Sequence, residues 1–380
     1  MSDTDKQQIH LVSEALRLLG DQYDLNREFN EFFNGEEPLS IVSPRQDVDA
    51  YQYERSKVLY WLDREAYDDE HSAWENDTNQ AKHQEVTGLI RTNGLIAPFQ
   101  DLLDAVERGR VVPFVGAGLS KPMGMPLWAE ALKQLLMRLP AADAPAITTL
   151  INSRQYLSAA QALVDHDVVQ TANFVRTIYR IQKIKLDGPM LLLPRFARGC
   201  VVTTNFDDAI ELTYRRHMVE FEGYMYGTQD HNFFQRLVRG DRCLLKLHGD
   251  ADNPVTHILT HAQYANAYGN GSPFDFHKPL PKALRQIFVS QSLLFLGCSL
   301  DQDWTLELFE QARAADEYAI PDHYAILSAP ADAQAKQQKE TRLLGLHIHP
   351  LWYPADQHEF VGRYLQLIVD VTEKRINFNG

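Results

Sequence analysis

The sequence predicts an α/β protein with a doubly wound, Rossmann-like parallel sheet of six strands, a helical insertion and a helical N-terminal extension. Two observations carry this prediction. After residue 97, short and almost wholly apolar segments alternate with amphipathic ones, which is typical of parallel strands covered by helices on both faces. The first of these segments, 111–115, also leads into a glycine-rich turn of the kind that joins a buried strand to a helix.

Six short apolar segments account for the strands, and amphipathic segments between them account for the helices. The expected strands are 111–115, 200–203, 244–247, 293–296, 324–327 and 346–350. The expected helices are about 206–217, 279–290, 303–315, 331–343 and 356–372, with a further one at 98–110 before the first strand. Residues 127–195 predict a series of helices, so they form an insertion after the first strand and its turn.

The N-terminal region, 1–98, has a different character, and we place a domain boundary between it and 99–380. An apolar stripe predicts a first helix that ends at Gly20, and a second amphipathic stretch covers about 47–66. The charged segment 63–83 is compatible with either a solvated helix or a loop. This region is either a helical cap on the main domain or a surface for an oligomer or a partner.

The charge of the chain argues against general nucleic-acid binding. The 380 residues carry a net charge of −14, and residues 1–98 contribute −11 of it, with 20 acidic and 9 basic side chains. The remaining 31 acidic and 28 basic side chains leave −3 for 99–380. Since affinity for nucleic acid comes mostly from Lys and Arg at the phosphates, we expect no strong direct binding.

The cysteines and the N-terminus point to a cytoplasmic protein. Cys200, Cys243 and Cys298 form no C-x-x-C pair, so we expect no zinc site. Few, unpaired cysteines are typical of a protein in a reducing compartment. The acidic N-terminus is unlike a signal peptide. No run reaches the ~18 apolar residues of a membrane-spanning helix, and we expect no membrane association. His347 and His349 alternate on the last strand and could bind a metal, but strand packing is the favoured interpretation.

Small, polar or titratable residues follow four of the predicted strands. These segments are Gly116-Ala117-Gly118-Leu119-Ser120, Thr203-Thr204-Asn205-Phe206-Asp207, His248-Gly249-Asp250 and Gly297-Cys298-Ser299-Leu300-Asp301. In a doubly wound sheet, ligands bind at the carboxyl ends of the strands. A single Asn or His there is usually a cap or a turn residue, but four such segments in one crevice indicate a binding site.

These segments, with Gly124-Met125-Pro126-Leu127-Trp128 and Lys246-Leu247, resemble the motifs of the sirtuin-like superfamily over about 100–350. The resemblance is to the NAD-hydrolase branch of bacterial anti-phage defence systems, the type paired with a HerA ATPase. It implies NAD as the substrate, no metal, a homo-oligomer and a partner such as a HerA-type ATPase. The resemblance assigns catalysis to Asn205 and His248, and NAD binding to Gly116, Ala117, Gly118, Ser120, Thr204, Asp207, Gly297 and Ser299.

The chemistry of cutting NAD gives these residue types a reason. Breaking the bond between nicotinamide and ribose passes through an oxocarbenium-like state, as in glycoside cleavage. Asn205 can orient a water at C1′ of the ribose, and His248 can hold a ribose hydroxyl and act as a general base. Asp207 is either a ligand of NAD or an N-cap of the helix that follows it.

Two departures from the protein-deacylating sirtuins favour water as the acceptor. Three scattered cysteines cannot build the four-cysteine zinc ribbon of those enzymes, and the Asp-Phe-Arg part of their Gly-Ile-Pro-Asp-Phe-Arg motif is missing after Gly124-Met125-Pro126. The expected products are therefore ADP-ribose and nicotinamide, with NAD depletion as abortive defence. Three alternatives remain: a regulatory subunit that senses NAD or ADP-ribose, a nuclease subunit of a defence complex, and an ADP-ribosyl transferase.

Overall fold

The chain divides into two compact units, Met1–Gln84 and Glu85–Gly380. The computed structural model describes residues 3–35, 37–42, 50–138, 144–180, 186–269, 273–301, 304–315 and 319–378. The boundary falls inside helix α4 (Arg64–Thr92), earlier than the predicted boundary at residue 98. The reason is that Val86, Ile90 and Leu95 are buried in the core of the larger unit.

The smaller unit is only partly helical, which corrects the expectation for this region. Its elements are α1 (Asp3–Leu25), α2 (Arg27–Asn34), β1 (Leu39–Val42), β2 (Ala50–Tyr53), α3 (Arg55–Leu62) and the first part of α4. Helix α1 continues through Gly20, where the sequence predicted its end, and β2 of the antiparallel pair β1–β2 lies in the predicted amphipathic stretch 47–66. An aromatic cluster of Tyr23, Phe29, Tyr60 and Tyr67 forms the core.

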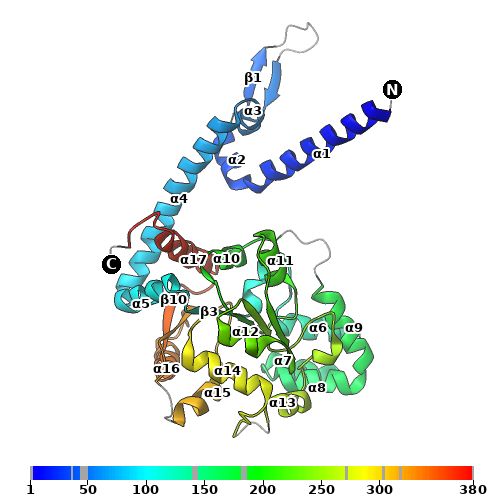
Figure 1. Cartoon of the computed structure of the whole chain (residues 1–380), viewed down its shortest axis with the longest axis vertical. Helices are drawn as coiled ribbons and strands as arrows, with labels where there is room; N and C mark the ends of the chain where they lie inside the picture. Colours follow the sequence, from blue (N-terminus) through cyan, green and yellow to red (C-terminus); the bar gives the residue numbers. More distant parts are fainter. Residues whose placement is uncertain are drawn as a thin grey trace. The chain divides into compact units, whose positions relative to one another are not determined.

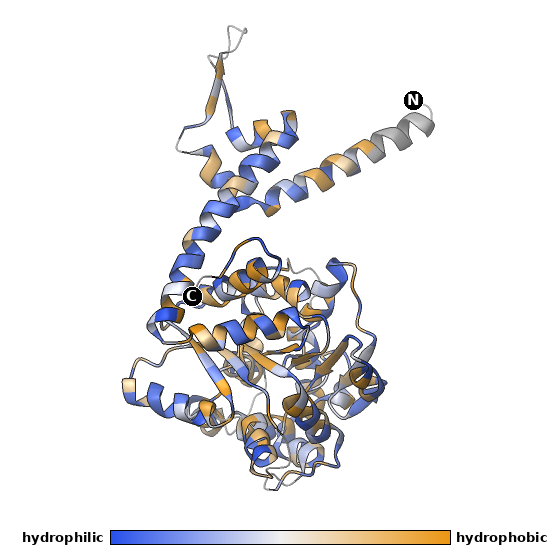
Figure 2. Ribbon diagram, turned by 60° about the vertical axis from the view of Figure 1, so that its left-hand side comes forward, coloured by the Kyte–Doolittle hydropathy of each residue, from blue (hydrophilic) through white to orange (hydrophobic). Residues whose placement is uncertain are grey.

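Helix α1 carries an apolar surface that the described part of its own unit leaves exposed. The side chains of Val12, Leu16 and Leu18 are 59%, 52% and 50% exposed. In an amphipathic helix, apolar side chains such as these usually form the buried face. Figure 2 shows orange segments between blue ones along this helix. Near its C-terminal end α1 buries the aromatic side chain of Tyr23.

The larger unit is built on a mixed sheet in which all six predicted strands take part. They are β3 (Val111–Val115), β4 (Val201–Thr203), β7 (Cys243–Lys246), β8 (Ser292–Leu296), β9 (His323–Ser328) and β10 (Ile348–Tyr353). Among the described residues the sheet has eight strands, in the order β10-β9-β8-β3-β4-β7-β5-β6, so the prediction of six was wrong. Numbered in chain order, the six predicted strands follow the 3-2-1-4-5-6 arrangement of doubly wound nucleotide-binding sheets.

The two additional strands extend one edge of the sheet. Strand β5 (Gly223–Tyr226) lies parallel to β7, and β6 (Gln229–His231) pairs with β5 in the antiparallel sense. Strand β6 is short and polar, and Asp230 and His231 are exposed. No apolar run marks such an edge strand in the sequence, which is why it escaped prediction.

Helices cover both faces of this sheet, as the apolar strands require. Alternate residues of β3 face opposite cores: Val111 and Val115 belong to one, Val112 and Phe114 to the other. The first core is closed by α5 (Ile96–Glu107), α10 (Leu193–Phe196), α11 (Ala209–Arg216) and α17 (Glu359–Thr372). The second is closed by α12 (Phe233–Arg239), α13 (His261–Tyr268), α14 (Pro279–Ser290), α15 (Trp304–Ala314) and α16 (Ala333–Leu344) (Figure 1).

The predicted insertion is helical and has a core of its own. It contains α6 (Trp128–Arg138), α7 (Ala144–Asn152), α8 (Tyr156–His166), α9 (Val168–Ile178) and a 3-10 turn at Pro189–Leu192. Other 3-10 turns of the unit lie at Ala117–Leu119, Lys121–Met123 and Pro254–Thr256. Phe206, Ala251 and Leu259 from the loops at the ends of the sheet belong to the same core. The insertion therefore packs directly on the loops that follow β4 and β7. Within the described ranges, no helix is long and apolar enough to cross a membrane.

Candidate functional site

The centre of the candidate site is the point where strand order reverses, between β3 and β8. Here the turn after β3 and the loop after β8 touch through their backbones. The N–H of Gly116 donates to Leu296 O at 2.8 Å, and the N–H of Gly118 donates to Gly297 O at 3.0 Å. A crevice at such a reversal is the usual ligand site of a doubly wound sheet.

The glycines of these two loops are required by their mutual approach. A Cβ on Gly116 would lie 2.6 Å from Gly297 O, and one on Gly297 would lie 2.5 Å from Leu119 N. Gly297 also has φ of +66°, in the left-handed region that favours glycine. The N–H groups of Gly116 and Gly118 are already engaged, so a pyrophosphate bound through them would have to displace these two bonds.

Asn205, at the end of β4, is held against the first turn by its side-chain amide. Its Nδ2 donates to Gly116 O at 3.2 Å and to Ser120 Oγ at 3.0 Å, and its backbone N–H donates to Thr203 Oγ1 at 3.0 Å. Asn205 is 6% exposed and Ser120 is fully buried. Thr204 lies beside it, half-buried, with its N–H donating to Val115 O. The predicted residues Gly116, Ser120 and Asn205 therefore form one hydrogen-bonded group.

Asp207 lies next to this group, just before helix α11. Its Oδ1 accepts from the N–H of Ala209, the first residue of α11, but the N-cap position belongs to Asp208, so Asp207 is not the N-cap that the sequence offered as one alternative. The carboxyl group also interacts with Ser120. Burial raises the pKa of Asp207, although the nearby Lys246 ammonium and the hydrogen bonds from Ala209 and Ser120 act in the opposite direction. A role for this carboxyl in binding a ligand stays a prediction.

His248, at the end of β7, is oriented by a tyrosine that sequence reasoning missed. Tyr264, on α13, places its hydroxyl 2.6 Å from His248 Nε2, and the histidine is 8% exposed. A capping box begins α13, since Thr260 and Gln263 bond reciprocally, and the Thr-x-x-Gln spacing could have predicted this helix. Nothing in the sequence indicated that its tyrosine would reach the histidine.

Three aromatic rings lie close to His248. The ring centroids of Trp128, Phe206 and Tyr264 lie 6.3, 6.0 and 5.7 Å from that of the imidazole. Phe206 immediately follows Asn205, so its ring links the Asn205 loop to the histidine. This environment limits the access of water to the imidazole, which is what a reaction with a short-lived cationic centre requires.

Ser299 has a different position from the other predicted ligands. It is exposed, and its carbonyl oxygen accepts a hydrogen bond from Lys339 Nζ of α16 at 2.5 Å. Lys339 also bonds Asp301 Oδ1, so α16 fixes the outer part of the loop that starts at Gly297. Ala117, half-buried, lies in the 3-10 turn after β3. The contact to NAD predicted for Ala117 and Ser299 stays a prediction.

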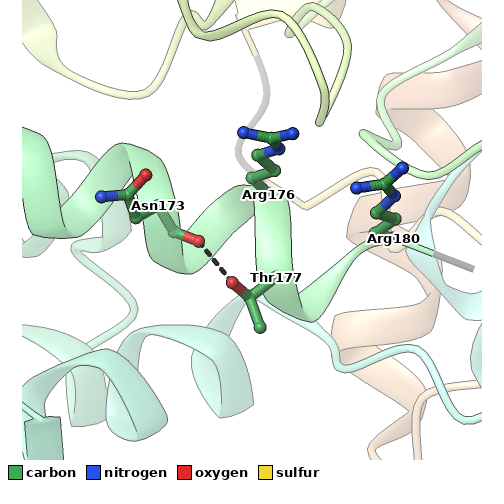
Figure 3. A pocket seen from close by; sticks show the side chains of 4 residues that line it. All are labelled: Asn173, Arg176, Thr177 and Arg180. Carbon is green, nitrogen blue, oxygen red and sulfur yellow. Dashed lines mark hydrogen bonds between the residues drawn. The ribbon is translucent and has the colours of Figure 1, made fainter.

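A hollow of about 390 Å³ lies on the insertion, along one face of α9 and the residues just after it. Asn173, Arg176, Thr177 and Arg180 line it, and Figure 3 shows the two guanidinium groups beside one another. Asp252, four residues after His248, has its Oδ1 3.4 Å from Arg176 Nε and 3.8 Å from Arg180 Nε. All three side chains are about half exposed, so these ion pairs contribute little to stability.

Of the two histidines predicted on the last strand, His349 lies on β10, whereas His347 lies just before its first residue, Ile348. Asp322 Oδ1 lies 3.6 Å from His347 Nδ1 and 3.3 Å from His349 Nε2, so a carboxylate that the sequence did not indicate lies between them. Across the described residues, no group of three or more His, Cys, Asp or Glu side chains could hold a metal ion.

The sequence of the chain is similar to that of known proteins. Residues 199–351 match the family model of the SIR2-like domain. The matched SIR2-like segment contains Asn205, His248 and Gly297, and the turn after β3 precedes it. The chain is also 27% identical over 228 residues to the NAD(+) hydrolase ThsA of Acinetobacter baumannii (strain 532279), and 22% identical over 231 residues to the NAD(+) hydrolase ThsA of Enterococcus faecium.

Both alignments cover 59% of this chain and 44% of the relative. The chain thus spans less than half the length of these curated relatives. The likeness therefore concerns one part of the relatives.

Proposed function

We propose that this protein hydrolyses NAD to ADP-ribose and nicotinamide. The observation that carries the proposal is the placement of Asn205 and His248 at the ends of two adjacent parallel strands, β4 and β7, each held by hydrogen bonds to its side chain. Relatives named NAD(+) hydrolase support the same reaction. Ala117, Thr204, Asp207 and Ser299 are proposed, with Gly116, Gly118, Ser120 and Gly297, to bind NAD.

In the proposed reaction the bond between C1′ of the ribose and the nicotinamide nitrogen breaks, and its electron pair leaves with nicotinamide. A water oriented by the Asn205 side chain attacks C1′, and its proton passes to His248, either directly or through a ribose hydroxyl. Asn205 now donates to Gly116 O and Ser120 Oγ, so a bound dinucleotide would have to share or replace these bonds.

The test is NAD cleavage by the full-length protein, followed as nicotinamide and ADP-ribose. Asn205→Ala and His248→Ala should each abolish product, because each removes a group that acts at C1′. Asn152→Ala and His217→Ala are matched controls at exposed positions of the same unit and should cleave at the wild-type rate. Cleavage by the Asn205 and His248 variants at the control rate would refute the proposal.

The products distinguish this proposal from the alternatives. A sensor subunit would bind NAD or ADP-ribose without releasing nicotinamide, and an ADP-ribosyl transferase would release nicotinamide without a matching amount of free ADP-ribose. A nuclease subunit would degrade nucleic acid, and the acidic charge of the chain gives little support to it.

We further propose that the activity serves anti-phage defence in the cytoplasm, as NAD depletion in infected cells. An enzyme that destroys NAD has to be restrained, so control by a homo-oligomer or by a partner such as a HerA-type ATPase is proposed with it. The exposed apolar residues of α1 support an assembly role for the N-terminal unit. Co-purification with the product of a neighbouring gene, and light scattering of the chain alone, test these two forms of control.

A further inference from the structure

We infer that Lys246 is a positioning residue that fixes the Asn205 loop and the His248 loop relative to each other. The inference rests on the proposed function and extends it to a residue that touches neither proposed reacting group. Lys246 is the last residue of β7, and its side chain is completely buried, which is rare for a lysine.

The ammonium group of Lys246 bonds three segments. Its Nζ donates to Asp207 O at 2.7 Å, to Asp250 Oδ2 at 2.7 Å and to Glu211 Oε1 at 3.1 Å. Asp207 lies two residues after Asn205, and Asp250 lies two residues after His248. One cation therefore holds the far end of each loop, and Glu211 attaches both to the first turn of α11.

The bonds around Asp250 show why this contact controls the histidine. Lys246 and Asp250 close a five-residue turn in which His248 is the central residue, and the N–H of Gly249 donates to Lys246 O. Asp250 also accepts from the N–H of Asp252 through Oδ1, and its carbonyl oxygen lies 2.9 Å from His257 Nε2. Without the ammonium, the Asp250 carboxylate loses its charged partner, and the turn loses its closure.

The charges of the cluster favour a charged lysine. Burial alone lowers the pKa of Lys246, but the Glu211 and Asp250 carboxylates outweigh it and raise that pKa above its ordinary value. Burial raises the pKa of Glu211, and Lys246 opposes this shift. Removing the cation therefore leaves buried carboxylates without their counter-ion, a change that usually destabilises a fold. A test has to separate this general effect from positioning.

The experiment compares Lys246→Met, Lys246→Arg and the control Lys282→Met, which makes the same change at an exposed lysine of α14. Lys246→Met should lower kcat for NAD on the order of 10²-fold per folded molecule, because a misplacement of about 1 Å has that effect. KM should change less than kcat, since Lys246 contacts neither the turn after β3 nor the loop after β8, and its bond to Asp207 is to the backbone carbonyl and not to the carboxylate. Lys246→Arg keeps the charge and should recover part of kcat.

A second variant covers the case in which Lys246→Met does not fold. In Lys246→Met/Glu211→Gln/Asp250→Asn the buried charges are neutralised together. If this variant folds and stays inactive, positioning is supported. If it folds with wild-type kcat, or if Lys246→Met itself keeps wild-type kcat, the inference is overturned.

A readout that needs no turnover separates this inference from the proposed function. The ring signals of His248 in a ¹H–¹³C correlation spectrum, assigned with His248→Asn, should shift in Lys246→Met and stay unchanged in Lys282→Met. If wild-type protein does not cleave NAD, the proposed function fails, and the histidine signals still decide the role of Lys246. Unchanged signals in folded Lys246→Met would overturn it.

Discussion

Replacing Gly297 by alanine tests whether the contact between the two glycine loops is essential to the larger unit. The new Cβ would lie 2.5 Å from Leu119 N and 3.0 Å from Gly118 C, and both are backbone atoms that cannot rotate away. The left-handed φ of +66° adds about 1–2 kcal/mol for a residue with a Cβ. Crowding of a packed contact adds about 1–3 kcal/mol, so we expect a loss of about 2–5 kcal/mol in the free energy of unfolding.

The assay is urea unfolding of the full chain, followed by far-UV circular dichroism, with Gly88→Ala as the matched control. Gly88 lies in the part of α4 that belongs to the same unit, it is exposed, and a Cβ there meets no atom within 4 Å. Alanine at this helical position should therefore stabilise the unit by about 0.5–1 kcal/mol. Equal stability of Gly297→Ala and wild type would refute the argument that the loops need this close approach. NAD cleavage by Gly297→Ala should fall as well, because the Gly116 carbonyl that Asn205 bonds would move.

Three further predictions follow from single contacts. Tyr264→Phe removes the hydroxyl bonded to His248 and should lower kcat for NAD about tenfold, the equivalent of one hydrogen bond. The control Tyr364→Phe, in α17, should leave kcat unchanged. Equal kcat values for the two variants would contradict the orienting role of Tyr264. Burial, with a smaller contribution from His347 and His349, lowers the pKa of His323 to about 3. The buried neutral imidazole therefore contributes its full stability above pH ~6.5. This stability is lost as the pH falls toward 3, by up to about 1.4 kcal/mol per pH unit. His323→Asn should flatten the pH dependence of urea unfolding between pH 7 and 4, and an unchanged slope would exclude this histidine as its source. Leu16→Glu/Leu18→Glu on α1 should lower the mass measured by light scattering if α1 mediates assembly, while Ser13→Glu on the same helix should not, and the same mass for both would rule out this surface.

The sequence by itself determined the local pattern of the larger unit. Short apolar runs marked all six strands of its doubly wound core, because parallel strands buried on both faces have no polar face. The polar residues after four of these runs marked the strand ends, where Asn205 and His248 lie. Strand β6 has no apolar run, so the sequence did not predict it. The end of α1 was predicted too early, because a glycine such as Gly20 is tolerated inside a helix.

Only the tertiary structure decided which of these local features meet. Strand order brings the turn after β3 against the loop after β8, so the glycines of both are explained by each other, 180 residues apart in the chain, and not by a ligand alone. Tyr264 reaches His248 from a helix, and Lys246 joins two loops from within the sheet, through side-chain contacts that depend on packing in three dimensions. Periodicity reports which face of an element is buried, whereas a hydrogen bond between distant segments depends on how the elements are packed, and no local pattern encodes that.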